Sequence, residues 1–294
     1  MKIFPFSQGA DTPTVRISLA VLVVGCIMPI VIVASFMVFD FYQREHFQLI
    51  GNALSRARAM ISMVDRQFAS TQAALQALST SGALARGELN VFHARAVEAL
   101  ANIHADSIVV VNVEGQLLLS TSTPYGASLP KLNSAPLLKR VLNTGKPGVS
   151  DLYVGPIVGY PIYTVGVPIH RDGATGFLLA ATTAPVRLAS ILEEQRLPSN
   201  WRAAITDSAG SVVARSQDIE KFLGKKINPE LLSQTRIMDE GVVKSTTLDG
   251  IPVVSVYSRS PVSSGDARQP AAGHFPDRTR RYPNGRAGDE VGCL

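Results

Sequence analysis

The first pattern along the chain is an unbroken apolar run. Residues Ile17–Phe39 contain no charged side chain, and Arg16 and Asp40 border them. As a helix, these 23 residues would be about 34 Å long, which is enough to cross a hydrocarbon core of about 30 Å. The apolar region of a cleaved signal peptide is shorter, about 7–15 residues. We therefore predict an uncleaved membrane helix at Ile17–Phe39 that contacts lipid.

The second pattern is helical and covers Asp40 to about Leu84. Its apolar positions recur at alternating steps of three and four, with polar Thr71 in the same series: Phe47, Ile50, Leu54, Ala57, Ile61, Val64, Phe68, Leu75 and Leu78. This spacing is a heptad seam and predicts one long helix. The stripe could pack on the domain that follows or pair with a second chain, and both interpretations remain open. A second helix is predicted at Leu89–His104.

The third pattern has the short period of strands. Ser107–Ser122 contains two β-prone runs around a polar turn, which predicts a hairpin. Ser134–Gly145 has a capping serine, an early proline and a final glycine, so it predicts a short helix. Strand-like segments then run from Gly148 to Thr182. Antiparallel strands with helices at one end indicate an α+β fold.

The strand pattern then repeats. Arg202–Gln217 matches the hairpin of Ser107–Ser122, with glycines Gly115 and Gly210 in corresponding turns. The later matches are a short helix at Asn228–Ile237 and two strand segments, Gly241–Ser245 for Gly148–Ser150 and Ile251–Val256 for Tyr160–Val165. Internal repetition predicts two similar units joined by a helical linker near Pro185–Leu197.

Composition and motifs exclude several function classes. The chain has 294 residues, 46% of them hydrophobic and only 17% charged, and its net charge is +5. Collagen, wholesale disorder and a disulfide scaffold do not fit, and Cys26 and Cys293 are not expected to pair. We find no nucleophile elbow, zinc-protease motif, phosphate-binding loop or metal spacing among the five histidines. We predict that this chain is not an enzyme and holds no cofactor or metal.

Binding residues are expected in the first repeat, where four of the seven tyrosines fall within 39 residues. Tyrosine combines an apolar ring with a hydroxyl that hydrogen-bonds, and a carboxylate can hold a cationic group. The candidate ligand-binding residues are Tyr125, Asp151, Tyr153, Tyr160, Tyr163 and Thr182. The alternative, that these tyrosines only pack at edges and in the core, stays open.

The order of these motifs resembles a known family. A membrane anchor and long helix are followed by G-V-S, Y-P-I, V-P-I, R-D-G and G-F-L-L-A between Gly148 and Ala181. This resembles the double Cache extracellular sensor modules of bacterial histidine kinases, chemoreceptors and cyclases, over about residues 40–263. The resemblance implies two PAS-like lobes on one long helix, with a small ligand in the membrane-distal lobe. The amino-acid-binding version carries an arginine and a tryptophan that Ser150–Pro168 lacks, so amino-acid sensing is not supported.

The resemblance and the patterns together predict six parts. They are a cytoplasmic N-terminus (1–16), a transmembrane helix (17–39), a long helix and helical lead-in (40–102), a membrane-distal Cache lobe (103–185), an incomplete membrane-proximal lobe (186–263) and a disordered tail (264–294). The tail has five arginines that four acidic residues offset, so no nucleic-acid partner is expected. It replaces the closing strand, second membrane helix and output domain of a typical relative, and a reading-frame change near Ser263 would explain this.

The expected function is therefore sensory. We predict the periplasmic small-molecule-sensing input region of a bacterial transmembrane receptor, of the histidine kinase type, without its own output domain. Lys2 and Arg16 precede the apolar run, which favours a cytoplasmic N-terminus in the inner membrane. The expected partners are an unknown small ligand, membrane lipid and a second copy paired through the long helix. The alternative is a single-span, membrane-tethered binding or structural module that acts through a partner protein.

Overall fold

The computed structural model describes residues 15–132, 135–171, 174–261 and 291–293. The first element is α1 (Val15–Ser79), one 65-residue helix with Pro29 inside it. Among the described residues, α1 holds the one stretch long and apolar enough to cross a membrane, Val24–Phe41, with a mean hydropathy of 2.2 and no buried residue. It overlaps the predicted span Ile17–Phe39. The chain divides into two compact units, and all later elements belong to the unit that begins at Ala53.

From Ala53 onward, α1 packs one face against the sheets. Its buried side chains follow steps of four, three, four, four, three and four residues, at Ala53, Ala57, Met60, Val64, Phe68, Thr71 and Leu75. Four positions of the predicted heptad seam, Ile50, Leu54, Ile61 and Leu78, are only half-buried. The strict heptad is therefore wrong for this face, because a straight helix of 3.6 residues per turn drifts away from a 3.5-residue repeat. The interpretation in which the stripe packs on the following domain is confirmed.

Two further helices follow α1: α2 (Gly82–Ala85) and α3 (Leu89–Leu100). The helix predicted to reach His104 ends at Leu100, where backbone hydrogen bonds from Ala101 to Glu98 and from Asn102 to Ala99 tighten the last turn. Phe92 and Ala96 on α3 are fully buried. This helix covers the start of the first sheet.

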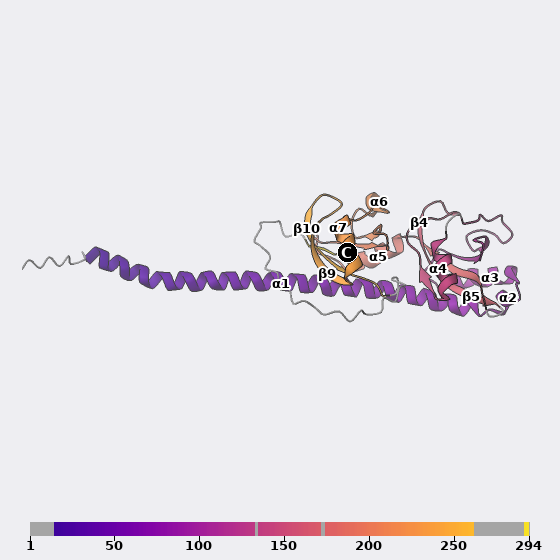
Figure 1. Cartoon of the computed structure of the whole chain (residues 1–294), viewed down its shortest axis with the longest axis horizontal. Helices are drawn as coiled ribbons and strands as arrows, with labels where there is room; N and C mark the ends of the chain where they lie inside the picture. Colours follow the sequence, from indigo (N-terminus) through magenta and orange to yellow (C-terminus); the bar gives the residue numbers. More distant parts are fainter. Residues whose placement is uncertain (1–14, 133–134, 172–173, 262–290, 294) are drawn as a thin grey trace, which may run out of the picture. The chain divides into compact units, whose positions relative to one another are not determined.

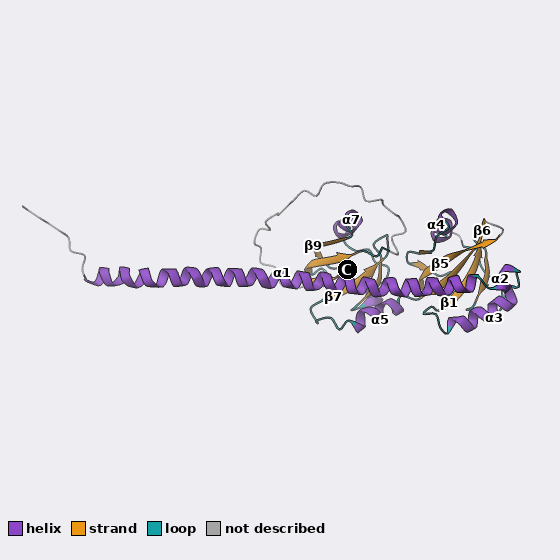
Figure 2. Ribbon diagram, turned by 90° about the horizontal axis from the view of Figure 1, so that it is seen from below, coloured by secondary structure: helices purple, strands orange, loops and turns teal. Residues whose placement is uncertain are grey.

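The first lobe is a sheet with helices on both faces. Its order is β2-β1-β6-β5-β3, with β4 paired to β5, and every pairing is antiparallel. One face packs against α1 and α3, and the other packs against α4 (Figures 1 and 2). The elements are β1 (Ser107–Asn112), β2 (Leu117–Ser120), α4 (Pro136–Thr144), β3 (Gly148–Val149), β4 (Tyr153–Val154), β5 (Pro161–Arg171) and β6 (Ala174–Thr183).

Helix α4 largely follows its sequence signals. Pro136 stands at its start, and Gly145 ends it with a φ of 63°, a left-handed conformation that glycine adopts without strain. The N-cap is Ala135 rather than the predicted Ser134, which lies outside the described residues.

The second lobe repeats this arrangement. Its strand order is β8-β7-β11-β10-β9, and Asn228 caps α7 by accepting a 2.9 Å hydrogen bond from the Glu230 amide. The elements are α5 (Val186–Glu194), which joins the lobes, β7 (Arg202–Thr206), β8 (Val212–Arg215), α6 (Ile219–Phe222), α7 (Pro229–Ile237), β9 (Glu240–Thr246), β10 (Pro252–Ser258) and β11 (Val291–Cys293).

Matching local details show that the lobes are copies of one design. The turn glycines Gly115 and Gly210 have φ values of 83° and 76°. Each hairpin shifts register at its first strand's end, and an isolated bridge follows each turn, Gln116 to Lys131 and Ser211 to Lys226. The predicted α+β fold is confirmed. Most of the predicted tail lies outside the described residues, whereas its residues 291–293 form β11.

Candidate functional site

The candidate site is a row of hydroxyl groups across the first sheet, made by Ser107, Thr182, Thr164 and Tyr153. Ser107 on β1 is the register partner of Thr182 on β6, and Thr182 is the register partner of Thr164 on β5. The Ser107 and Thr182 hydroxyls share a 2.6 Å hydrogen bond, and the Tyr153 and Thr164 hydroxyls share one of 2.7 Å. We call these four residues the hydroxyl row.

Strand alternation puts the hydroxyl row on the α4 face of the sheet. Neighbours in the strands, such as Val109 and Ala180, belong to the cluster that packs against α4, whereas Ile108 and Ala181 belong to the cluster on the α1 face. Ser107, Thr164 and Thr182 are 4%, 4% and 8% exposed. A few polar groups set in an apolar surface are typical of small-molecule sites.

Tyr153 is the most exposed residue of the row, at 37%, so only part of its side chain is removed from water. The removal of water raises the pKa of the Tyr153 hydroxyl, and its hydrogen bond with Thr164 opposes the rise. Tyr153 therefore stays neutral at ordinary pH, so its hydroxyl can both donate and accept a hydrogen bond. The Thr164 amide also donates to the Ser150 hydroxyl, at 2.9 Å, which fixes β5 at this point.

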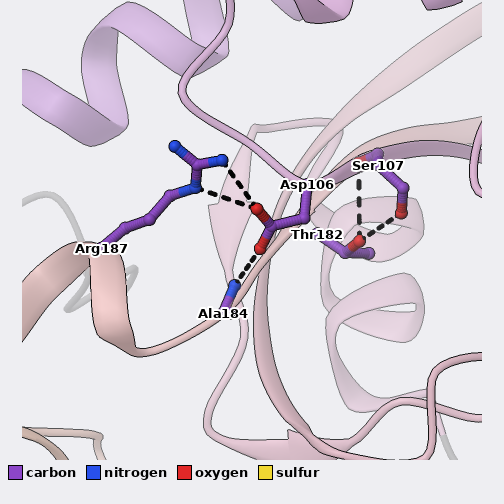
Figure 3. Close-up of polar contacts among 5 residues, drawn as sticks. All are labelled: Asp106, Ser107, Thr182, Ala184 and Arg187. Carbon is purple, nitrogen blue, oxygen red and sulfur yellow. Dashed lines mark hydrogen bonds and ion pairs between the residues drawn. The ribbon is translucent and has the colours of Figure 1, made fainter.

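One end of the hydroxyl row is tied to the linker helix α5. The Asp106 carboxylate accepts hydrogen bonds from the Ala184 amide, at 2.6 Å, and from Nε and Nη2 of Arg187, at 3.0 and 2.8 Å (Figure 3). Figure 3 shows this ion pair directly beside the Ser107–Thr182 contact. The Asp106 carboxylate therefore already has its hydrogen-bond partners. Its contacts with Ala184 and Arg187 fix the start of α5 beside the hydroxyl row.

Tyr163 on β5 faces α1, on the side of the sheet opposite to the hydroxyl row. Tyr163 is 4% exposed and meets Phe68 of α1 edge to face, with ring centroids 5.8 Å apart. Burial raises the pKa of Tyr163 to about 12, and a hydrogen bond with Thr183 opposes that rise. Tyr163 and Thr164 are consecutive residues of β5. Tyr163 contacts α1 on one face of the sheet, and Thr164 belongs to the hydroxyl row on the other face.

The six residues predicted from the sequence do not share one site. Tyr153 and Thr182 belong to the hydroxyl row, whereas the buried Tyr163 lines, together with Asp151, a separate cavity of about 170 Å³ beside α1. Tyr160 is 44% exposed, and Tyr125 is 52% exposed beside His93, with ring centroids 6.0 Å apart.

The sixth predicted residue, Asp151, joins the two lobes. Its Oδ1 accepts from the amide and the hydroxyl of Ser208, at 2.9 and 2.7 Å. In return, the Asp207 carboxylate accepts from the Leu152 amide at 3.2 Å. Asp151 therefore has a role in holding the lobes together.

Sequence reasoning did not single out Ser107, Thr164 or Arg140. Arg140 on α4 donates to the Val149 carbonyl, and its Nε is buried without a hydrogen-bond partner in the described part of the chain. The available signal was a serine or threonine at the same end of three apolar strands. Among the described residues, no cluster of three histidine, cysteine or acidic side chains could hold a metal ion.

The fold is that of known extracellular sensor domains, whereas no family model and no curated protein sequence matches the chain. The extracellular domain of a protein described as a putative histidine kinase, rpHK1S-Z16, is 13% identical with a TM-score of 0.57, over 70% of this chain and 86% of that one. The corresponding domain of mmHK1S-Z3 is 12% identical with a TM-score of 0.56, over 74% and 90%. The ligand-binding domain of the Pseudomonas aeruginosa PAO1 amino acid chemoreceptor PctB, in complex with L-Gln, is 12% identical with a TM-score of 0.50, over 69% and 80%.

These neighbours confirm the Cache-type sensor fold that the resemblance predicted. By their names, two of them are extracellular domains of putative histidine kinases and the third is the ligand-binding domain of a chemoreceptor.

Proposed function

We propose that this chain is the sensory input region of a membrane receptor and that its first lobe binds a small polar molecule at the hydroxyl row. The observation that carries the proposal is the burial of three hydroxyl side chains in an apolar sheet face, with Tyr153 reaching the same row. Polar groups in such surroundings need partners, and at present they pair with one another. A ligand with hydroxyl or amide groups would replace the hydrogen bonds within the row by hydrogen bonds to the ligand.

The chemistry of the row favours an uncharged ligand. Hydroxyl groups donate and accept hydrogen bonds but carry no charge. The adjacent carboxylate, Asp106, is already satisfied by Arg187 and the Ala184 amide. Sugars, polyols and primary amides have the matching groups, and we propose this class as the ligand.

Signal transmission would pass through β5 and β6. A ligand that moves Thr164 also moves Tyr163, which contacts Phe68 on α1. A ligand that moves Thr182 acts on Ala184 and α5 through Asp106. A ligand shifts the balance between two arrangements of these strands only if it binds one arrangement more tightly than the other. Both routes begin at residues within one strand position of the row.

We further propose that α1 crosses the bacterial inner membrane with its N-terminus in the cytoplasm, so that the two lobes are periplasmic. The apolar stretch Val24–Phe41 and the cations Lys2 and Arg16 before it support this orientation. The receptor would be of the histidine kinase type, as two of the structural neighbours are described. It would act as a homodimer paired through α1.

A thermal-shift screen of the full chain in detergent tests the ligand proposal. The panel contains sugars, polyols and primary amides, with amino acids as a comparison set. We expect an uncharged compound to raise the melting temperature, and Thr164→Val and Tyr153→Phe to remove that increase because each deletes one hydroxyl of the row.

The matched control is Tyr160→Phe, which removes a hydroxyl from an exposed tyrosine of the same lobe. It should leave the ligand-induced shift unchanged. A hit that survives both row variants would place the ligand elsewhere and contradict the proposal.

A further inference from the structure

The second lobe has a counterpart of the hydroxyl row, with different chemistry. In the first lobe the row crosses β1, β6 and β5 through residues that are register partners. In the second lobe Arg202, Gly292 and Ser255 are register partners across β7, β11 and β10. An arginine therefore stands at the place of Ser107, and glycine, which has no side chain, stands at the place of Thr182.

A second arginine replaces a second serine beside this row. Arg215 on β8 is the register partner of Ala204 on β7, as Ser120 on β2 is the register partner of Val109 on β1. The turn glycines of the two hairpins, when aligned, equate these two pairs. The second lobe thus carries two cations where the first lobe carries two hydroxyl groups.

A cavity of about 50 Å³ lies beside the two arginines, and all of its lining residues belong to the second lobe. Val212, Ile227 and Leu231 form its apolar wall, as part of the cluster that packs against α7. Both arginines and Ser255 line it as well. By the same measure one water molecule needs about 10–15 Å³, so the cavity has room for about three to five non-hydrogen atoms.

Arg215 brings an unsatisfied donor to this cavity. Its side chain is 5% exposed, and its Nη2 donates to the Asp249 carboxylate. Its Nη1 is buried without a hydrogen-bond partner in the described part of the chain. The guanidinium carbon lies 4.1 Å from the ring centroid of Phe222, a contact that supplies no acceptor oxygen. Buried polar groups are normally hydrogen-bonded, so this nitrogen is available to an oxygen of a ligand.

The surroundings of Arg215 are rich in positive charge. The Nζ atoms of Lys221 and Lys225 lie 5.0 and 5.1 Å from the centroid of the same aromatic ring. The hydrogen bond from Arg215, followed by the charges of Lys221 and Arg202, holds the pKa of Asp249 below its ordinary value. Several cations thus act on one ionised carboxylate, and an anion placed among them would reduce the repulsion between like charges.

Two serines add a further donor. Ser245 and Ser255 both line the cavity, and their hydroxyl groups share a 2.6 Å hydrogen bond. One shared hydrogen bond uses only one of the two hydroxyl hydrogens, so the other can be donated to a ligand. A guanidinium and a hydroxyl in an apolar wall are suited to an oxygen anion.

We propose that the second lobe binds a small monovalent oxyanion in this cavity, such as a short carboxylate, with Arg215 as its charged partner. The volume limits the ligand to a few non-hydrogen atoms, and Asp249 disfavours a doubly charged anion because it repels each added negative charge. The ligand class differs from that of the first lobe because arginines replace serines. This inference does not rest on the ligand proposed for the hydroxyl row.

Trp201 provides a local readout, because it is the only tryptophan of the chain, is 7% exposed and directly precedes Arg202. Acetate is titrated into the full chain in detergent at constant ionic strength, with chloride as the balancing anion. We expect a saturable change in the fluorescence of Trp201. Acetamide, which has the shape of acetate without its charge, should give no such change, and sulfate should bind more weakly than acetate.

Variants of the buried ion pair test the role of Arg215. Arg215→Gln combined with Asp249→Asn removes both charges and should weaken acetate binding at least about tenfold, because a hydrogen bond to a charged donor is lost. Asp249→Asn alone should strengthen binding, which a purely structural ion pair would not do. The matched control is Arg236→Gln, which removes an exposed arginine of α7 in the same lobe and should bind acetate like the wild type.

Four results would overturn the inference. They are no saturable response of the wild type to acetate, an equal response to acetamide, tighter binding of sulfate than of acetate, and unchanged acetate affinity in the double variant. The first three use the wild type, so they decide the question even if the double variant does not fold. An uncharged compound that binds at the hydroxyl row should not displace acetate. Failure of the ligand screen for the first lobe would leave this inference unaffected.

Discussion

The two lobes share a strand order but differ in how the central position of the sheet is filled. In the first lobe β6 follows β5 closely in the sequence, and it pairs with the whole of β1 and with β5 from Tyr163 to Arg171. In the second lobe the central strand comes from residues 291–293, after more than thirty intervening positions, and covers a short part of β7. The central strand of the first sheet therefore pairs with every residue of β1, whereas β11 pairs with β7 only at Arg202 and Ala203.

The lobes also differ in what corresponding residues do. Asn112 and Asp207 occupy equivalent turns, and each accepts a hydrogen bond from the amide four residues later, at 2.8 and 2.7 Å. The carboxylate of Asp207 uses its other oxygen to bind the Leu152 amide of the first lobe. The same turn is therefore local in one copy and part of the contact between lobes in the other.

The largest expected effect concerns the central strand itself. Leu179 of β6 is fully buried, and Leu179→Ala should lower the free energy of unfolding by about 2–5 kcal/mol through lost burial and a new cavity. Removal of residues 291–294 should cost less, about 1–2 kcal/mol, because β11 pairs with β7 only at Arg202 and Ala203. Urea unfolding of the two variants measures the difference, and equal losses would show that β11 stabilises its sheet as much as Leu179 stabilises the other.

The next effect concerns a tyrosine that only the first lobe has. Val254 is the equivalent of Tyr163 in the second lobe, by the alignment of Pro161 with Pro252. Burial raises the pKa of Tyr163 to about 12, so the unfolded chain ionises first, near pH 10, and the folded state loses stability as the pH rises from 10 to 12. The loss should reach about 2–3 kcal/mol.

Denaturant unfolding across this pH range measures the loss, and the control is Tyr163→Phe, which cannot ionise. The wild type should become less stable relative to the variant as the pH rises. A constant difference between the two proteins would show that Tyr163 is not desolvated.

The smallest expected effect concerns the contact between lobes. Asp151→Ala removes two hydrogen bonds to Ser208, each of them near the surface, and should lower stability by about 1 kcal/mol. Asp151→Asn keeps one acceptor oxygen and should lose less. Differential scanning calorimetry would show the Asp151→Ala transition broaden as the lobes uncouple, and an unchanged, narrow transition would assign their cohesion to the apolar core instead.

Local signals made much of the fold predictable. The hairpin turns need Gly115 and Gly210 at positive φ, and the short helices carry Pro136 and Pro229 in their first turns. The repeat of these signals predicts two lobes. The long helix was also predictable, but its buried face was not, because a heptad and a 3.6-residue stripe share most of their positions over a few turns.

The site depends on contacts that sequence position does not reveal. Ser107 and Thr182 are 75 residues apart, and they meet because β6 inserts between β1 and β5. Tyr163 was predicted to bind ligand for the chemistry of its side chain, yet strand alternation turns it toward Phe68. Asp151 was selected for its charge, whereas its partner Ser208 belongs to the other repeat. In each case the partner of the side chain depends on the order of the strands and on the face of the sheet toward which the side chain points. No single sequence motif encodes either of these.

The contacts along α1 have a mechanical consequence. In the second lobe, α1 is held by directional bonds, from Arg58 to Glu240 at 2.6 Å and from the Ser260 hydroxyl to Asp65. The first lobe meets the helix through rings and aliphatic groups, such as the contact of Tyr163 with Phe68. Apolar contacts are non-directional, whereas hydrogen bonds weaken steeply when their distance or angle changes. Sliding parallel to the helix axis is therefore easier for the first lobe, and the second lobe acts as the fixed reference against which such a displacement would be measured.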